Sequence, residues 1–331
     1  MPLGARLFPW RLAAIVLALG LFALPGRAEA ACTANTANAS FGTVDSFTAS
    51  DVAQQVSVPT GLRCSGSLLS LISTNWINAD VTASTYYSGN VPLLRNAATG
   101  DTIPFALCET AACSPSRMIG GRLRWESTTF LDLLGLFNAS DGSLPVYLRT
   151  TPPGPVSAGT YTGAVTIGWS WRLCSLGALG LCVYETGSGS STLNVTLIVT
   201  EACMITAPDL DFGSGALLSS FAPVTRTIAV RCSKDSDYTV GIDNGVHAQG
   251  GQRRLAGGGG AIAYDLYYPA NGPGRWGSAG GQRVSSAAAT VRGGTYNGVD
   301  AQQYTYRAEI LPGPPPVAGV YTDTLTVDVQ F

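Results

Sequence analysis

Eight cysteines carry the chemistry that the spacing of this sequence predicts most directly. Two pairs lie close together and can each close a short loop, while the other four form two longer intervals of similar length. Cysteines of an exported protein form disulfides. Zinc is the weaker alternative, because no two of them have the C-x2-C spacing. We therefore predict four disulfides: Cys32–Cys64, Cys108–Cys113, Cys174–Cys182 and Cys203–Cys232.

A Ser/His or Cys/His catalytic pair would have to use His247, the one histidine of the sequence. It lies between a predicted strand and a glycine-rich stretch, where we expect an exposed loop histidine. Two carboxylate pairs, Asp209 with Asp211 and Asp235 with Asp237, could serve a hydrolase or bind calcium. Both pairs lie beside turn signals, where aspartate commonly caps turns. We predict no enzyme activity, no cofactor and no metal site.

The composition indicates an all-β protein with two domains. The chain has 331 residues, of which only 12% are charged and 46% are hydrophobic, and this length suits two domains of about 150 residues. Thr, Ser, Gly and Val are frequent, whereas helix-forming residues are few. The formal net charge of −2 provides no basic surface for a nucleic acid, so we expect no nucleic-acid partner.

The first thirty residues have the features of an export signal. Arg6 and Arg11 give a positive start, a short apolar run covers residues 13–24, and the segment ends in Ala28-Glu29-Ala30. This order matches a signal peptide with an A-x-A cleavage site, and the apolar run is too short to span a bilayer. We predict a signal peptide over residues 1–30, export, and a mature chain that begins at Ala31.

An internal repeat divides the mature chain. Residues 158–167 match residues 318–327, and residues 103–107 match residues 262–266. The first cysteine of each copy is followed by a similar tripeptide, Ser40-Phe41-Gly42 in one and Asp211-Phe212-Gly213 in the other. Two tandem copies of one module explain these matches. We predict an N-terminal domain over residues 31–201 and a C-terminal domain over residues 202–331.

Each copy has the sequence pattern of a β-sandwich, with short alternating strands separated by Gly, Pro, Asn and Asp. The last strand of the second copy alternates apolar and polar residues, so one of its faces is apolar. Its apolar residues are Leu325, Val327, Val329 and Phe331, and their counterparts in the first copy are Val165, Ile167, Trp169 and Trp171.

The copies differ beyond this strand. The first continues through a loop closed by Cys174 and Cys182 into a further alternating strand, whose apolar residues are Leu193, Val195, Leu197 and Val199. The second copy stops at Phe331. If the further strand completes the first sandwich, the second is missing its last strand and presents an open apolar groove. A strand from another protein can fill such a groove.

The start of the mature chain supports the same expectation. A subunit that donates a strand needs a free extension, but only Ala31 precedes Cys32. We expect this chain to accept a strand and to donate none. In a linear polymer held together by strand exchange, it would then sit at one end.

These residues resemble the spore coat protein U domain family, which includes subunits of archaic (Csu-type) chaperone–usher pili. The resemblance lies in the Cys…Phe-Gly…Cys opening, the strand over residues 262–267, Arg275-Trp276-Gly277 and the ending over residues 318–331. It is specific across residues 203–331 and looser across 32–200, where Cys108-Glu109 replaces Tyr267-Tyr268. A chain of two such modules resembles the two-domain tip adhesin of those pili.

The resemblance implies two immunoglobulin-like sandwiches, the second an incomplete pilin domain. It also implies a periplasmic chaperone, an outer-membrane usher and a next pilus subunit that donates a strand. The chain would pass through the periplasm to the cell surface and lie at the pilus tip. The residues expected along its strand-accepting groove are Tyr321, Leu325, Val327, Val329 and Phe331.

The family also implies that the N-terminal domain binds an abiotic or host surface through exposed apolar loops and so supports biofilm formation. Two apolar runs are candidates: Phe130, Leu131, Leu133, Leu134, Leu136 and Phe137 in one, and Leu176, Leu179 and Leu181 in the other. The second is held in a disulfide loop too tight to bury all three leucines. A buried core segment or short helix is the alternative for the first. A third run, residues 86–94, is expected in the core.

Three classes of function therefore compete. A pilus tip adhesin requires an unfinished second domain and an exposed apolar tip on the first. A secreted structural coat or matrix protein requires two self-sufficient domains, and an exported hydrolase requires an acidic cleft. Aromatic residues could instead stack on sugar, although no polar cluster in the sequence specifies such a site. The missing last strand favours the adhesin.

Overall fold

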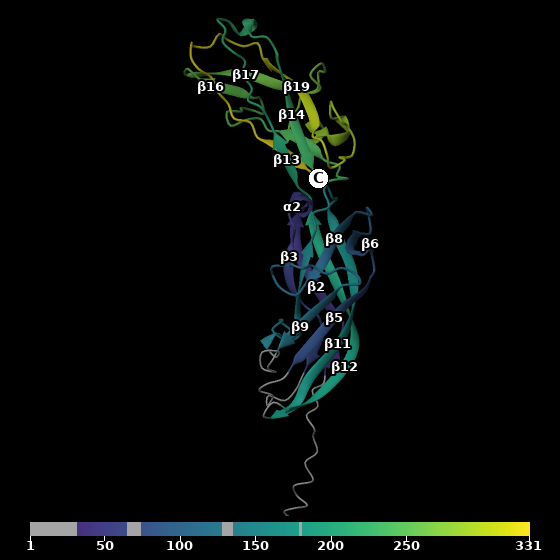
Figure 1. Ribbon diagram of the computed structural model, residues 1–331. Coiled ribbons are helices and arrows are strands. Elements are labelled where there is room, and N and C mark those ends of the chain that lie inside the picture. The colour runs from purple at the N-terminus through teal and green to yellow at the C-terminus, as the bar shows by residue number, and fades with distance from the viewer. Residues whose placement is uncertain (1–31, 65–73, 128–134, 179–180) are drawn as a thin grey trace, which may run out of the picture.

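A computed structural model describes residues 32–64, 74–127, 135–178 and 181–331, so the predicted signal peptide lies outside the described residues. The molecule is elongated, with two β-sandwiches placed end to end (Figure 1). In these ranges no helix is both long enough and apolar enough to cross a membrane.

The first sandwich contains twelve strands and one short helix. These elements are β1 (Cys32–Ala34), β2 (Ala37–Asp45), α2 (Ser46–Asp51), β3 (Gln55–Pro59), β4 (Leu62–Cys64), β5 (Asn75–Ser84), β6 (Tyr87–Ser88), β7 (Val91–Asn96), β8 (Thr102–Cys108), β9 (Arg122–Ser127), β10 (Pro145–Thr150), β11 (Gly159–Ala178) and β12 (Leu181–Thr200). Helix α2 starts where the Asp45 carboxylate accepts the main-chain N–H groups of Phe47 and Thr48, which ends β2 with a side-chain cap.

Strands β11 and β12 form a long hairpin that organises the first sandwich. It extends from the joint to the end of the molecule away from the second sandwich (Figure 1). β11 also pairs with β5 and, near its start, with β7, while β12 pairs in parallel with β2. The predicted inward residues of β12 are buried, as are Trp169 and Trp171 of β11. The alternation in the sequence is therefore confirmed.

The second sandwich is smaller. Its elements are β13 (Cys203–Thr206), η1 (Leu218–Ser220), β14 (Val224–Cys232), β15 (Thr239–Ile242), β16 (Arg254–Gly257), β17 (Gly260–Tyr267), η2 (Gly280–Gln282), β18 (Val284–Ser285), η3 (Ser286–Ala288), β19 (Gln302–Ile310) and β20 (Val327–Gln330). One sheet has the order β13-β14-β19-β17-β16, and the other has the order β18-β15-β20. Its core is rich in aromatic residues, with Trp276 surrounded by Tyr268, Tyr304 and Tyr306.

The repeat predicted from the sequence corresponds to equivalent strands. β8 and β17 carry the matched residues 103–107 and 262–266, and each lies in the interior of its sheet. Cys32 pairs in register with Cys64 across β1 and β4, as Cys203 does with Cys232 across β13 and β14. The four disulfides are those expected from the spacing.

The loop closed by Cys174 and Cys182 belongs to the end of a hairpin, because β11 and β12 stay paired as far as Ala178 and Leu181. One local expectation was wrong. The predicted last strand is shorter than its apolar alternation, since β20 begins only at Val327. The residues just before β20 make two separate main-chain hydrogen bonds to the segment after β15. The oxygen of Thr324 accepts the N–H of Val246, and the oxygen of Thr326 accepts the N–H of Asp243.

Candidate functional site

An open groove of about 430 Å³ runs along one side of the second sandwich. One wall is the segment after β13, residues 207–212, and the other is the segment that leads into β20, residues 323–327. Between them the floor is mainly apolar core. The lining residues outside the two walls are Ile228, Ile242, Leu255, Tyr264, Leu266 and Tyr306.

The groove occupies the place that β12 takes in the first sandwich. There β12 lies between β11, its antiparallel partner, and β2, its parallel partner. In the second sandwich β20 is the counterpart of β11, and the segment around Phe212 is the counterpart of β2 around Phe41. Among the described residues β20 pairs with β15 alone. The exposed edge of β20 therefore faces a gap with apolar walls.

A buried carboxylate interrupts the apolar lining. Asp323 lies in the wall before β20, and its side chain is 1% exposed. Its Oδ2 accepts the hydroxyl of Tyr264 at 2.7 Å, and its Oδ1 accepts the main-chain N–H of His247 at 3.2 Å. The Nδ1 atom of the same histidine lies 3.1 Å from Oδ1. Burial and the neighbouring carboxylate raise the pKa of Tyr264, so its hydroxyl stays protonated and donates.

The residues predicted for the groove have separate positions. Leu325 and Val327 line it, and both pack partly buried against the core of the second sandwich. Val329 also packs against that core, farther along β20. Tyr321 donates its hydroxyl to the main-chain oxygen of Val317. Phe331 is 53% exposed. The sequence therefore located one wall of the groove and missed the opposite wall.

The predicted surface-binding residues fall mostly outside the described part of the chain. Phe130, Leu131, Leu133, Leu134 and Leu179 lie there. Leu176 and Leu181 belong to the paired ends of β11 and β12 at the far end of the hairpin. In the first apolar run, Leu136 and Phe137 pack partly buried against the core of the first sandwich, which agrees with the core alternative for these two residues. In the third run, Leu94 is fully buried, as expected for core, and Tyr87 is 64% exposed.

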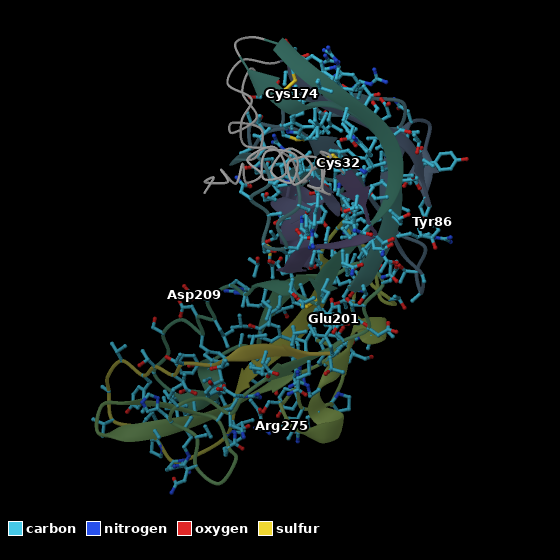
Figure 2. All side chains as sticks on the ribbon, turned by 90° about the horizontal axis from the view of Figure 1, so that it is seen from below. Cys32, Tyr86, Cys174, Glu201, Asp209 and Arg275 are labelled. Carbon is cyan, nitrogen blue, oxygen red and sulfur yellow. A yellow bond between two sulfur atoms is a disulfide. The ribbon has the colours of Figure 1, made fainter. Side chains whose placement is uncertain are left out.

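The first sandwich also has a polar and aromatic row that was not predicted from the sequence. Trp76 of β5 lies directly across from Arg172 of β11. The Arg172 guanidinium lies over the ring of Tyr184 at 3.5 Å, and that of Arg124 lies over Trp76 at 5.3 Å. These side chains share the outward face near the hairpin end, where Figure 2 shows Cys174 far from the second sandwich. The regular spacing of Arg122, Arg124 and Glu126 in β9 is the sequence pattern that could have predicted this outward polar face.

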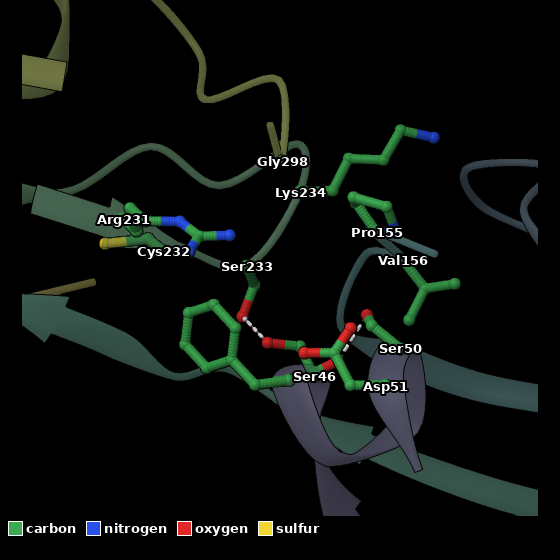
Figure 3. Close-up of a pocket in the computed structure, with 11 residues that line it drawn as sticks. Ser46, Ser50, Asp51, Pro155, Val156, Arg231, Cys232, Ser233, Lys234 and Gly298 are labelled. Atoms are coloured by element: carbon green, nitrogen blue, oxygen red, sulfur yellow. Dashed lines mark hydrogen bonds between the residues drawn. The ribbon is translucent and has the colours of Figure 1, made fainter. Parts of the chain in front are cut away.

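The two sandwiches meet at a polar joint (Figure 3). The hydroxyls of Ser46 in α2 and Ser233 after β14 are 2.7 Å apart and share a hydrogen bond. Lys234 forms an ion pair with Asp101 of the first sandwich. This pair raises the pKa of Lys234. Burial tends to raise the pKa of Asp101, but bonds from Lys234 and Ser157 outweigh it and lower that pKa. A small cavity of about 30 Å³ remains beside these residues.

The residues considered for catalysis do not form an acidic cleft. His247 lies in a turn and its side chain is 43% exposed, as expected, although its contact with Asp323 was not foreseen. Asp211 accepts the N–H of Gly213 and so caps a turn. Asp237 accepts the hydroxyl of Thr295. Within the described residues, no three His, Cys, Asp or Glu side chains gather as a metal site would require.

Comparison with known proteins gives one family and several structures. The family model of the Spore Coat Protein U domain matches residues 19–168 and again residues 190–328. A search of the curated proteins found no match. A crystal structure of the CsuC–CsuE chaperone–tip adhesion subunit pre-assembly complex from archaic chaperone-usher Csu pili of Acinetobacter baumannii is similar at 26% identity. The match has a TM-score of 0.64 and covers 91% of this chain and 100% of that chain.

Two other adhesin structures were found with lower similarity. The CupB6 tip adhesin from Pseudomonas aeruginosa is 13% identical, with a TM-score of 0.33, and the match covers 91% of this chain and 94% of that chain. CfaE, the adhesive subunit of CFA/I fimbria of enterotoxigenic Escherichia coli, is 10% identical. Its TM-score is 0.30, and the match covers 89% of this chain and 92% of that chain.

Proposed function

The chain belongs to the Spore Coat Protein U domain family, and from this premise we propose that it is the tip adhesin of an archaic chaperone–usher pilus. Its role is adhesive and structural, without catalysis. The observation that carries the proposal is the groove between residues 207–212 and 323–327, at the place of β12 in the first sandwich. The similarity to the Csu tip adhesion subunit complex supports it.

In this proposal the second sandwich, residues 202–331, is a pilin domain that accepts a strand from another chain. A strand inserted beside β20 completes the sandwich and buries the apolar lining, including Leu255 and Leu325. A periplasmic chaperone occupies the groove first, an outer-membrane usher receives the complex, and the next pilus subunit then supplies its own strand. The chain is exported and lies at the pilus tip on the cell surface.

The first sandwich, residues 31–201, is the part proposed to contact a surface. It is closed by its own β12 and needs no partner strand. Its β11–β12 hairpin points away from the second sandwich (Figure 1), which is the position required of a tip. Leu176 and Leu181 of the second apolar run belong to the paired ends of this hairpin. Apolar side chains at such a tip bind abiotic or host surfaces through area removed from water.

Strand acceptance can be tested on the oxidised full-length chain with a synthetic peptide that copies residues 191–200 of β12. Calorimetry of thermal unfolding should show that the peptide raises the melting temperature of the second sandwich and leaves the first unchanged, because ligands stabilise only the unit that they bind. A scrambled peptide of the same composition is the control. Leu325→Arg places a charge in the groove wall and should abolish the shift. A second sandwich that ignores every peptide would support the self-sufficient coat or matrix protein instead.

Surface attachment can be tested with one charge at the hairpin tip. Leu179→Asp should reduce adsorption of the full chain to polystyrene, because it places a hydrated carboxylate in the apolar contact. Val52→Asp is the matched control, since Val52 is also exposed and apolar but comes directly after helix α2 at the joint. If both variants lose adsorption equally, or if neither loses any, the hairpin tip is not the part that contacts the surface. If the chain binds a sugar array and this binding requires Trp76, the polar and aromatic row on β5, β9, β11 and β12 would be the binding site instead.

A further inference from the structure

The two sandwiches differ in polarity at one place beside the missing strand. Tyr264 in β17 corresponds to Phe105 in β8, and Asp323 before β20 corresponds to Gly163 in β11. In the first sandwich Gly163 lies opposite Val195 of β12, which is 1% exposed. The closed sandwich is thus apolar where the open one carries a hydroxyl and a carboxylate. A strand with the apolar side chains of β12 therefore suits the apolar environment in the first sandwich but not the polar one in the second.

Asp323 is an inward-facing residue of the groove wall. Residues two apart in an extended segment face the same side, so Asp323 faces the same way as Leu325 and Val327, which pack against the core. Its Oδ2 atom also contacts Tyr264, another groove-lining residue. His247 approaches the carboxylate from the solvent side, because its own side chain is 43% exposed. The other side of the carboxylate faces the groove, and an inserted strand would approach the carboxylate from that side.

The Asp323 carboxylate is already removed from water, since its side chain is 1% exposed. Burying a carboxylate costs several kcal/mol unless donors replace the lost water. An ionised carboxylate has about four acceptor positions, and the protein supplies the Tyr264 hydroxyl, the His247 N–H and the contact with its ring. A residue directly opposite on an antiparallel strand has its Cβ about 5 Å away. The occupant's residue at this position therefore reaches Asp323.

We propose that Asp323 selects the strand that fills the groove. The occupant is an extended segment of another polypeptide, apolar at the positions that correspond to Leu193 and Leu197 of β12. At the position that corresponds to Val195 it carries a hydroxyl or another hydrogen-bond donor. This inference rests on the proposed strand acceptance and adds the chemistry that the accepted strand presents.

The first test compares peptides on the oxidised full-length chain. One peptide copies residues 191–200, and the second differs only by serine at the position of Val195. We expect the serine peptide to bind at least ten-fold more tightly by isothermal titration calorimetry. A third peptide, with valine kept and serine placed instead at the outward position of Ile198, which is 42% exposed in β12, controls for polarity alone and should bind like the first.

The second test removes the carboxylate. Asp323→Gly restores the residue found in the first sandwich and should reverse the preference toward the valine peptide. Asp323→Asn keeps the shape, so it covers the case in which the glycine variant fails to fold, and it should reduce the preference to about two-fold or less. Both peptides are titrated into each variant after its two unfolding transitions have been verified.

The outcomes separate the two proposals. If the peptides bind the wild type equally and Asp323→Asn changes nothing, selection by Asp323 is wrong while strand acceptance stands. If no peptide binds the wild type or shifts the second transition, strand acceptance itself is wrong and the selection falls with it. A serine preference that disappears in Asp323→Asn supports both.

Discussion

The first and second sandwiches share one sequence module, but β12 of the first has no counterpart among the described residues of the second. In the first, β11 pairs with β12 along the hairpin, and β12 reaches across to β2. In the second, the described residues leave β20 paired with β15 alone, and the segment matching β2 has no ladder partner. The groove of the second sandwich therefore lies where the first is closed by its own strand.

The sandwiches also differ in how their two sheets are joined. In the second, Arg253 is fully buried and donates to Asp265 of β17 and to the main-chain oxygens of Ile242 and Trp276. The counterpart of Asp265 in the first sandwich is Ala106. Burial lowers the pKa of Arg253, and the Asp265 carboxylate opposes this effect. The open sandwich therefore carries a charged cross-link where the closed one has apolar packing.

The largest effect should come from breaking this cross-link. Arg253→Met removes the donor to Asp265 Oδ1 and to several buried main-chain oxygens and leaves Asp265 only its second partner, the partly exposed Arg275. It should destabilise the second sandwich by about 3–5 kcal/mol. The unfolding transition of the first sandwich should not move. Differential scanning calorimetry of the full chain measures both. Arg254→Met is the matched control, because Arg254 contacts only the exposed Gln249 side chain through its guanidinium; a similar loss in both variants would contradict the role of Arg253.

Much of this fold was predictable from local sequence. Alternation identified the inward residues of β12, and the paired cysteines fixed one end of the β1–β4 ladder and one end of the β13–β14 ladder. The Arg253–Asp265 pair was not predicted, since it depends on the packing of two sheets. The length of β20 was overestimated for a related reason. Alternation reports which side chains face inward, whereas a ladder also needs a neighbouring strand.

A smaller effect should separate a fully buried side chain of the closed sandwich from a groove-lining side chain of the open one. Leu197→Ala removes a fully buried side chain of β12 and should destabilise the first sandwich by about 2–5 kcal/mol. Leu325→Ala, in the half-filled groove, should cost the second sandwich only about 1 kcal/mol. A bound strand peptide should increase the cost of Leu325→Ala. Urea unfolding with and without peptide measures each value, and equal costs without peptide would mean that the groove is already filled.

The candidate site was predicted only in part. Leu325 and Val327 followed from alternation, but the opposite wall around Phe212 requires knowledge of how β13 leads across the sandwich. His247 was correctly expected in an exposed loop. Its partner Asp323 lies far along the chain, and no periodicity links the two. Asp323 has the same spacing in the sequence as the apolar residues Leu325 and Val327, but its inward position became clear only from its contacts.

The smallest effect concerns the joint between the two regions. Lys234→Met removes the ion pair with Asp101 and should weaken the coupling of the two unfolding transitions by about 1 kcal/mol or less, since Lys234 is 30% exposed.

The pKa of Asp101 is lowered, so its contribution is present above its unfolded value near 3.8 and is lost as the pH falls through the folded pKa. The pKa of Lys234 is raised, so its contribution is present below 10.5 and is lost as the pH rises through the folded pKa. Wild type and variant should therefore differ most between about pH 4 and 10, and converge below the folded pKa of Asp101 and above that of Lys234. Calorimetry across this range, with Lys234→Arg as the charge-preserving control, measures the difference. A pH-independent difference would mean that packing around Ser46 and Ser233, rather than the ion pair, couples the closed sandwich to the open one.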